Sequence, residues 1–225
     1  YKGTYDGWYC VACEALYLES DLLEGGLCPM HKKPVGKVQE ENYFFKLTKY
    51  RDALLEYIEM HPEFVQPVSR RHEIVNYIKD HMSDVSISRQ NARCGIEVPG
   101  DSEHKIYVWF DALINYLSAV GYGSDGEKFD AWWPAHLHLV GKDIIKFHCA
   151  LWPAMLMSAE LQLPKQVFVH GFFTVNGEKM SKTTGNVVSP LAIAEKYGVD
   201  PMRYYLLREI SFGEDGDFST ARMAG

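Results

Sequence analysis

The sequence predicts an α/β fold built around a parallel sheet and preceded by a small zinc-binding segment. Strand-like runs are followed by helical patterns at 105–117, at 136–157 and from 167 onward. Such alternation is typical of parallel strands joined by right-handed crossovers. Two closely spaced pairs of possible metal ligands occupy the first 31 positions. With 225 residues, 47% of them hydrophobic, the chain has enough apolar content for one large or two small domains.

Charge and composition limit the partners. The chain has 23 Lys and Arg against 30 Asp and Glu, a net charge of −7, so no general field attracts nucleic acid and we expect no DNA partner. No cationic start leads into an apolar run, and no stretch is long enough to span a bilayer. We therefore expect a soluble, cytoplasmic protein without a membrane partner. Because it starts without Met, we also expect it to be a piece of a longer protein.

The first motif is Cys10-x2-Cys13 followed by Cys28-x2-His31. Three thiolates and an imidazole complete a tetrahedron and leave no position for water, which predicts one structural Zn²⁺ per chain. The metal would stabilise a segment of about 40 residues, too small for a core of its own. The alternative is a set of unrelated buried cysteines, which is how we interpret Cys94 and Cys149.

The next elements form a scaffold. A strand is predicted over 38–47, followed by a helix that Thr48 caps and that ends near Met60. A second helix is predicted over 71–80, and strand-like runs follow at 85–88, 95–99 and 105–110. None of these segments forms a catalytic constellation.

An aromatic stripe marks the helix after residue 110. Trp109, Ala112 and Tyr116 lie at i, i+3 and i+7 and therefore share one face. A buried stripe of this kind is usually core. Two of its members, however, carry an N–H or O–H that needs a partner when buried, and a ligand is one way to supply it.

The second strand-to-helix unit ends its strand at Gly141. Glycine permits a ligand to approach the backbone at the carboxyl end of a strand, where open α/β sheets bind nucleotides. Asp143 can accept a hydrogen bond from a ribose hydroxyl or, equally, cap the following helix. On that helix Ile144 and His148 are one turn apart. His148 alone also suits a core position.

The third unit leads into a lysine-bearing loop. An apolar strand over 167–175 meets Asn176-Gly177, a strong hairpin-turn signal. Beyond it, Lys179 and Lys182 lie between Gly177 and Gly185, and two ammonium groups on a hinged loop suit a polyphosphate. The alternative is a solvated turn. Two helices are predicted after the loop, opened by Ser189-Pro190 and by Asp200-Pro201.

The segment from Lys179 to Thr183 resembles the Lys-Met-Ser-Lys-Ser signature of class I aminoacyl-tRNA synthetases, with Thr183 keeping the last hydroxyl. Together with the Cys/His pairs and the stretches 107–116 and 141–148, its order resembles the methionyl-tRNA synthetases of the bacterial single-zinc type. The resemblance implies three regions. They are a zinc-binding connective insertion at 1–88 with its knuckle at about 1–41, the second half of a Rossmann-type catalytic domain at 89–186, and the start of a stem-contact helical region at 187–225.

The resemblance also implies roles for individual residues. The methionine side chain would be bound by Trp109, Ala112, Leu113, Tyr116, Ile144 and His148. A Tyr hydroxyl or a His N–H there can donate weakly to the thioether sulfur. Mg²⁺-bound ATP would be held by Gly141, Asp143, His170, Phe173, Lys179, Met180, Ser181, Lys182 and Thr183. Lys179 and Lys182 would be catalytic through the triphosphate.

The implied reaction is ATP-dependent activation of L-methionine to methionyl-adenylate, with transfer to initiator and elongator methionine tRNA. The chain has no His-x-Gly-His motif, and the family's first half-domain and anticodon-binding domain have no counterpart in it. We therefore expect the isolated chain to be inactive. Two alternatives stay open: another class I synthetase for an aliphatic amino acid, and a non-catalytic, zinc-stabilised RNA-binding module.

Overall fold

The computed structural model divides the chain into two compact units, one of Tyr1–Lys49 with Ser83–Phe129 and one of Tyr50–Met82 with Asp130–Gly225. These boundaries differ from those of the three predicted regions, which stay a prediction. The residues that the structure describes are 1–12, 15–17, 19–30, 32–90, 94–180 and 185–224.

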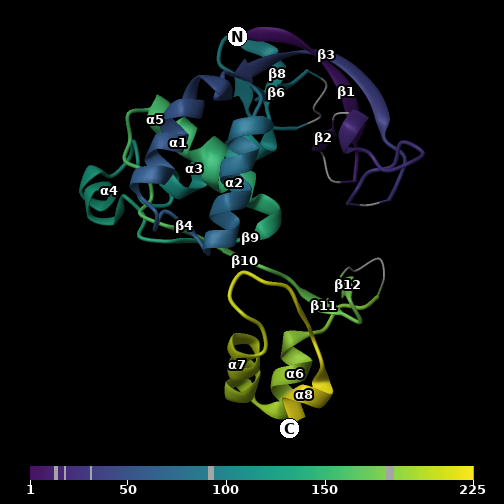
Figure 1. The fold of residues 1–225 in the computed structure, drawn as a ribbon. Coiled ribbons are helices and arrows are strands. Elements are labelled where there is room, and N and C mark those ends of the chain that lie inside the picture. The colour runs from purple at the N-terminus through teal and green to yellow at the C-terminus, as the bar shows by residue number, and fades with distance from the viewer. Residues whose placement is uncertain (13–14, 18, 31, 91–93, 181–184, 225) are drawn as a thin grey trace. The chain divides into compact units, whose positions relative to one another are not determined.

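A long antiparallel ribbon dominates the first unit (Figure 1). Strand β1 (Lys2–Cys10) pairs with β3 (Gly36–Phe45), which confirms the predicted strand and places its start two residues earlier. The sheet order is β2-β1-β3-β5, with β2 at Ala15–Tyr17 and β5 at Val85–Ser86. A short 3₁₀ turn, Glu19–Asp21, follows β2.

A second, antiparallel sheet of this unit corrects one prediction. Strands β6 (Ser88–Arg89) and β7 (Glu97–Val98) flank β8 (Asp101–Ile106). The run 105–110 is therefore not a strand of the parallel sheet. Instead β8 turns back on β7 as a hairpin, and helix α3 (Val108–Ser118) begins directly after Tyr107, whose carbonyl accepts from Asp111 N at 3.1 Å. Helix α4 (Gly126–Trp132) comes next in the sequence.

The predicted parallel sheet lies in the second unit. Its order is β4-β10-β9, with β4 at Val65–Gln66, β10 at Val167–His170 and β9 at His138–Gly141. Both pairings are parallel, which confirms the sheet type. Strand β4 takes the place that the run 105–110 was expected to fill, and its two residues were too short a signal to be recognised.

Two helices, α1 (Arg51–Met60) and α2 (Val68–Asp80), contribute Leu54, Ile58, Ile74 and Ile78 to the core, each at most 2% exposed. The expectation that Thr48 caps α1 is wrong. A 3₁₀ turn, Leu47–Tyr50, precedes the helix, and its N-cap is Tyr50 without a side-chain bond. Thr48 instead donates to Asp84 Oδ1 through its N–H at 3.1 Å and its hydroxyl at 2.7 Å.

The helical segment after β9 consists of three kinds of turn. It opens as 3₁₀ at Lys142–Ile144, continues as a π-helical stretch at Phe147–Leu151 and ends as α5 (Trp152–Ser158). The predicted helix through residue 157 is thus confirmed in extent but not in regularity. π-Helical turns are often found at functional sites.

The predicted strand 167–175 is interrupted, since β10 ends at His170 and the next strand begins at Phe173. Between them, the backbone at Gly171 passes directly against the carbonyl of Glu214 and leaves no room for a side chain. Strand β11 (Phe173–Val175) pairs with β12 (Glu178–Lys179) and with β13 (Gly216–Asp217). Three helices lie near the C-terminus in Figure 1: α6 (Pro190–Tyr197), α7 (Val199–Arg208) and α8 (Thr220–Ala224). The predicted start of α6 at Ser189-Pro190 is confirmed, and Ser189 Oγ caps the helix by accepting from Ala192 N at 3.4 Å. No helix in the described part of the chain is long and apolar enough to cross a membrane.

Candidate active site

The carboxyl ends of two neighbouring parallel strands form the edge of the candidate site. Gly141, the last residue of β9, is the register partner of His170, the last residue of β10. The structure therefore brings together two residues that were expected to bind ATP. His170 is exposed, and its Nδ1 lies 2.7 Å from the Gly171 carbonyl oxygen. Ligands of open parallel sheets bind outside this end of the strands.

Gly141 lies at a crowded part of this edge, where a side chain would displace its neighbours. A Cβ atom there would lie 2.8 Å from Asp143 Oδ1 and 3.3 Å from a ring carbon of Phe172. Asp143 itself is exposed and does not cap the 3₁₀ turn. Its carboxylate makes no hydrogen bond to another residue that the structure describes, so it is available to accept one from a ligand hydroxyl.

Asp215 contacts this edge, although it lies 73 residues after Lys142 in the sequence. It pairs with the Lys142 ammonium group and accepts from Phe172 N at 2.8 Å. The Lys142 ammonium also lies 5.3 Å from the centre of the Phe172 ring. Its bond to Lys142 and the Phe172 N–H lower the pKa of Asp215. Sequence reasoning missed Asp215, because nothing in its neighbourhood signals a partner so distant in the chain.

The lysine loop leaves the core through a tight hairpin. Asn176 and Gly177 adopt φ values of 53° and 77°, which confirms the predicted turn, and Thr174 pairs with Lys179 along the strands. Asp217 Oδ1 accepts from Thr174 Oγ1 at 2.8 Å and from Gly177 N at 2.9 Å. Ser181, Lys182 and Thr183 lie outside the described residues, as does the side chain of Lys179.

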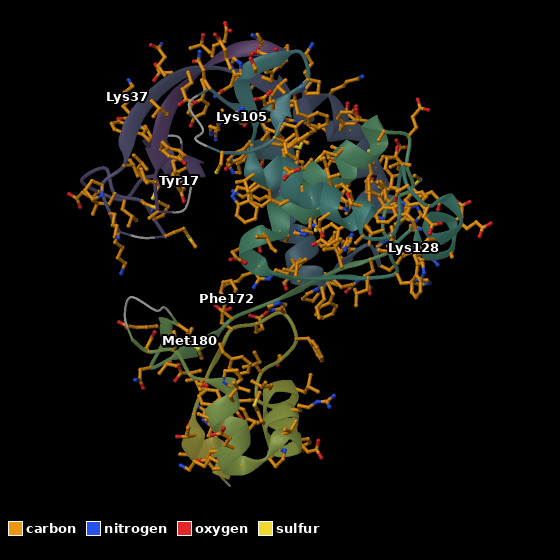
Figure 2. All side chains as sticks on the ribbon, turned by 180° about the vertical axis from the view of Figure 1, so that it is seen from behind. Tyr17, Lys37, Lys105, Lys128, Phe172 and Met180 are labelled. Carbon is orange, nitrogen blue, oxygen red and sulfur yellow. The ribbon has the colours of Figure 1, made fainter. Side chains whose placement is uncertain are left out.

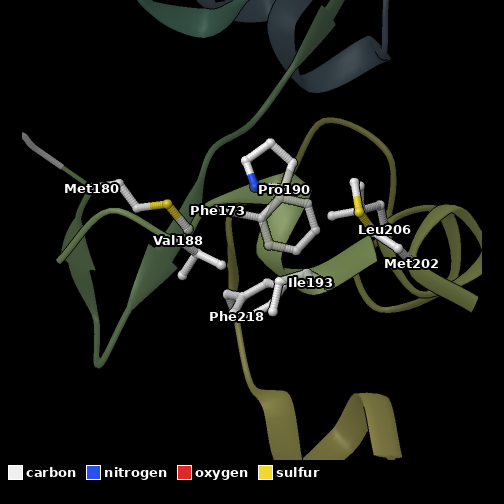
Figure 3. A pocket seen from close by; sticks show the side chains of 8 residues that line it. All are labelled: Phe173, Met180, Val188, Pro190, Ile193, Met202, Leu206 and Phe218. Carbon is white, nitrogen blue, oxygen red and sulfur yellow. The ribbon is translucent and has the colours of Figure 1, made fainter. Parts of the chain in front are cut away.

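Met180 extends from this hairpin into an apolar pocket of about 230 Å³. Figure 2 shows Met180 and Phe172 on the segment that follows β10, and Figure 3 shows the pocket from close by. The pocket is lined by Phe173, Met180, Val188, Pro190, Ile193, Met202, Leu206 and Phe218. Its lining comes from the strands beside the lysine loop, from both ends of that loop, and from α6 and α7.

The stripe on α3 is divided between core and surface. Leu113 is 4% exposed, whereas Trp109, Ala112 and Tyr116 are only half-buried. All four lie on helix α3, which confirms the shared face. The partial exposure of Trp109, Ala112 and Tyr116 argues against a purely core role for the stripe. Burial raises the pKa of Tyr116, so its hydroxyl keeps its proton and can donate.

His148 is buried in the second unit, and Ile144 is half-buried one turn before it. His148 Nδ1 lies 3.0 Å from the Ile144 carbonyl oxygen. Because a carbonyl only accepts, Nδ1 carries the proton, and Nε2 of the neutral ring is an acceptor. Burial lowers the pKa of His148. Of the two donors expected for a thioether, a Tyr hydroxyl or a His N–H, the His148 Nδ1–H is therefore directed at the Ile144 carbonyl. The predicted methionine-binding residues belong to different units, four to the first and two to the second.

Two of the four predicted zinc ligands are described. Cys10 ends β1 at 1% exposure, and Cys28, fully buried, begins a turn closed by Lys32 N to Cys28 O at 2.8 Å and Cys28 N to Lys33 O at 2.9 Å. Cys10 ends β1, and Cys28 lies in the connection from β1 to β3, whose two ends meet where Tyr9 pairs with Gly36. Cys13 and His31 lie outside the described residues, among which no group of three or more metal-ligand side chains occurs. Two buried thiols beside a tight turn fit the donor set of a structural zinc site.

Arg89 was not singled out from the sequence. Its guanidinium lies 4.2 Å from the centre of the Tyr107 ring and donates to Ser86 Oγ at 3.1 Å. Its Nε and Nη2 atoms are buried without a partner among the described residues. Buried donors of a cation are normally paired, so this side chain is a candidate contact for an anionic group. The sequence Ser-Ile-Ser-Arg at 86–89 resembles an ordinary surface strand, so it did not single out Arg89 as a functional residue.

Comparisons with known proteins identify the family of this chain. Residues 1–224 match the family described as tRNA synthetases class I (M). A Methionine--tRNA ligase from Thermotoga maritima is 54% identical over 99% of this chain and 36% of its own length. One from Clostridium acetobutylicum is 53% identical over 97% of this chain and 34% of its own length.

Among solved structures, Mycobacterium tuberculosis methionyl-tRNA synthetase in complex with methionyl-adenylate superimposes with a TM-score of 0.92 at 45% identity. The alignment covers 100% of this chain and 45% of that one. The chain thus spans between about a third and a half of the length of these relatives. Since the family match extends over residues 1–224, the chain has the mixed α/β fold of the class I tRNA synthetases and belongs to their M family.

Proposed function

We propose that this chain is the part of a methionine--tRNA ligase that binds ATP at the strand ends and the methionine side chain on α3. The whole protein would activate L-methionine as methionyl-adenylate and transfer it to initiator and elongator methionine tRNA. The observation that carries the proposal is the edge at which Gly141 and His170 meet, with an available carboxylate at Asp143. The names of the relatives and the adenylate in the solved neighbour support it.

At this edge, Asp143 accepts from the ATP ribose, and the backbone near His170 and Phe173 lies against adenine. Lys179 and Lys182 hold the triphosphate, assisted by the hydroxyls of Ser181 and Thr183. Met180 contributes through its backbone, because its side chain enters the apolar pocket.

The methionine carboxylate would attack the α-phosphorus of ATP, and pyrophosphate would leave in line. Mg²⁺ bound with ATP would neutralise phosphate charge. The chain needs no nucleophile or general base of its own for this step. Positioning and charge stabilisation account for the rate.

The methionine side chain is bound by Trp109, Ala112, Leu113, Tyr116, Ile144 and His148. The polarisable thioether packs well on aromatic rings. Tyr116 is the donor to sulfur, because the Nδ1 proton of His148 is already directed at the Ile144 carbonyl. Leucine lacks a sulfur acceptor, so a site that donates to sulfur discriminates against it.

A structural Zn²⁺ would be held by Cys10, Cys13, Cys28 and His31. It supplies stability and takes no part in the reaction.

The test is ATP–pyrophosphate exchange by the complete gene product, with methionine, leucine, isoleucine or valine as the amino acid. We expect exchange that depends on methionine, and little or none from the 225-residue chain alone. Dependence on one of the other amino acids would instead support a related synthetase. No exchange, combined with tight and strongly salt-dependent RNA binding by the chain, would support the RNA-binding alternative.

Tyr116→Phe sharpens the specificity part of the proposal. Losing one hydrogen bond of about 1 kcal/mol should reduce kcat/KM for methionine roughly five- to tenfold. The value for leucine should stay within about twofold, because leucine never used the hydroxyl. An equal loss for both amino acids would show that Tyr116 does not contact sulfur.

A further inference from the structure

A short acidic segment, Glu214–Asp217, crosses the candidate active site and is called the acidic strap below. Its two aspartates contact two different ATP-binding elements. Asp215 contacts Lys142 and Phe172 at the nucleotide edge. Asp217 contacts Thr174 and Gly177 in the hairpin that leads to the lysine loop.

The backbone of the strap is fixed on β11. Gly216 N donates to Phe172 O at 3.0 Å, and Phe218 N donates to Thr174 O at 2.8 Å. The strap is also fixed just before it begins, where Arg70 Nη2 donates to the Gly213 carbonyl at 2.8 Å. Gly213 has a φ of +88°, and a Cβ there would collide with the Pro67 ring. The strap therefore has little freedom to shift relative to β11.

Asp217 is placed to determine the geometry of the hairpin turn. A single carboxylate oxygen accepts both the Thr174 hydroxyl and the Gly177 N–H, which lie before and within the turn. The Gly177 N–H and then the Thr174 hydroxyl lower the pKa of Asp217, so the carboxylate is charged at neutral pH. Hydrogen bonds to a charged acceptor are stronger than neutral ones.

We propose that the acidic strap positions the β11–β12 hairpin, which leads to the lysine loop, with Asp217 as the positioning residue for the hairpin and Asp215 as that for the nucleotide edge. The inference rests on the proposed function, because it assigns the loop to the triphosphate. Asp217 touches no substrate and acts through the hairpin from which Lys179 continues. A lysine displaced by about 1 Å loses much of its effect on the transition state.

The experiment compares Asp217→Ala, Asp217→Asn and Asp215→Asn in the complete gene product. ATP–pyrophosphate exchange is normalised to active sites that are counted by titration with methionine and ATP. For Asp217→Ala we expect the KM for pyrophosphate to rise and the rate per active site to fall, each roughly tenfold, while the KM for methionine stays within about twofold. Asp217→Asn should show a smaller change, because its amide oxygen still accepts from Gly177 N–H.

Asp215→Asn serves as the contrasting variant. It should raise the KM for ATP, while the KM for pyrophosphate changes by less than about threefold. The proposal is overturned if Asp217→Ala lowers only the number of active sites, or if both aspartates give the same pattern. Either result would show a structural role alone.

A second readout does not depend on activity. Hydrogen–deuterium exchange of the peptide 172–180 should speed up in Asp217→Ala and remain as in the wild type in Asp215→Asn at residues 176–180. If the wild-type protein shows no methionine-dependent activity, the proposed function fails. The strap is then judged on exchange alone, and unchanged protection of the hairpin would overturn it.

Discussion

The β1–β3 ribbon and the β4-β10-β9 sheet are both β structures, but they are stabilised differently. In the parallel sheet, Val65, Val140, Val167 and Val169 are at most 5% exposed. In the ribbon, β1 buries only Gly7 and Cys10, and β3 buries only Asn42. The sheet is thus stabilised by apolar burial, whereas a ribbon with so little buried apolar surface needs another source of stability. Under the proposed function this source is the structural Zn²⁺ of the predicted site that includes Cys10 and Cys28.

Metal removal should have the largest effect on stability. It should destabilise the ribbon and leave the parallel sheet intact. Chelation, or Cys28→Ser, removes a contribution that is about 10 kcal/mol or more in small zinc domains. We expect hydrogen exchange to lose protection throughout β1 and β3 but not in β9 and β10. One zinc per chain should be lost by elemental analysis. Cys94→Ser, at an exposed position, is the matched control and should change neither quantity.

A core substitution should act on the second unit instead. Ile74 on α2 is fully buried, so Ile74→Ala should lower the free energy of unfolding by about 2–5 kcal/mol. Ile96→Ala, at 58% exposure, should change it by no more than about 0.5 kcal/mol. Denaturant titration measures both. If the Ile74 variant lost zinc while its parallel sheet stayed intact, the ribbon and the sheet would not be stabilised separately by metal and by apolar burial.

Acid should weaken the parallel-sheet region through His138. Burial, with a smaller effect from nearby His148, lowers the pKa of His138 from 6.5 to about 4. Between these pH values the unfolded chain binds a proton that the folded chain does not, so the free energy of unfolding falls as the pH drops from 6.5 to 4. Above pH 6.5 this contribution is constant.

His138→Gln should flatten that dependence, because glutamine has no proton to bind and its oxygen can still accept from Trp152 Nε1, which lies 3.3 Å from His138 Nε2. Stability measured from pH 4 to 8 tests this. An unchanged slope in the variant would assign the acid sensitivity to other groups.

The smallest effect is expected at Asp84, which accepts from Thr48 and from the Tyr1 hydroxyl at the base of the ribbon. Asp84→Ala should cost about 1 kcal/mol, typical of a lost local capping bond. Thermal unfolding of the metal-loaded protein measures it. A loss comparable to that of Cys28→Ser would mean that side-chain bonds rather than metal stabilise the ribbon.

Local signals in the sequence predicted the elements whose causes are local. Asn176-Gly177 forms the hairpin turn, Ser189 caps α6, and the apolar runs at β9 and β10 form parallel strands. Features that depend on distant residues were missed or wrong. Helix α3 begins three residues earlier than expected because β8 turns back on β7, and Asp215 reaches Lys142 across 73 positions. Neither partner can be identified from one sequence.

The most direct test is a crystal structure of the complete gene product with methionyl-adenylate, recorded on both sides of the zinc absorption edge. We predict that the adenylate lies at the ends of β9 and β10, with its ribose on Asp143 and its thioether on Trp109 and Tyr116. We also predict one anomalous peak bonded to Cys10 and Cys28. An adenylate bound away from these strands, or no peak at the cysteines, would contradict the account.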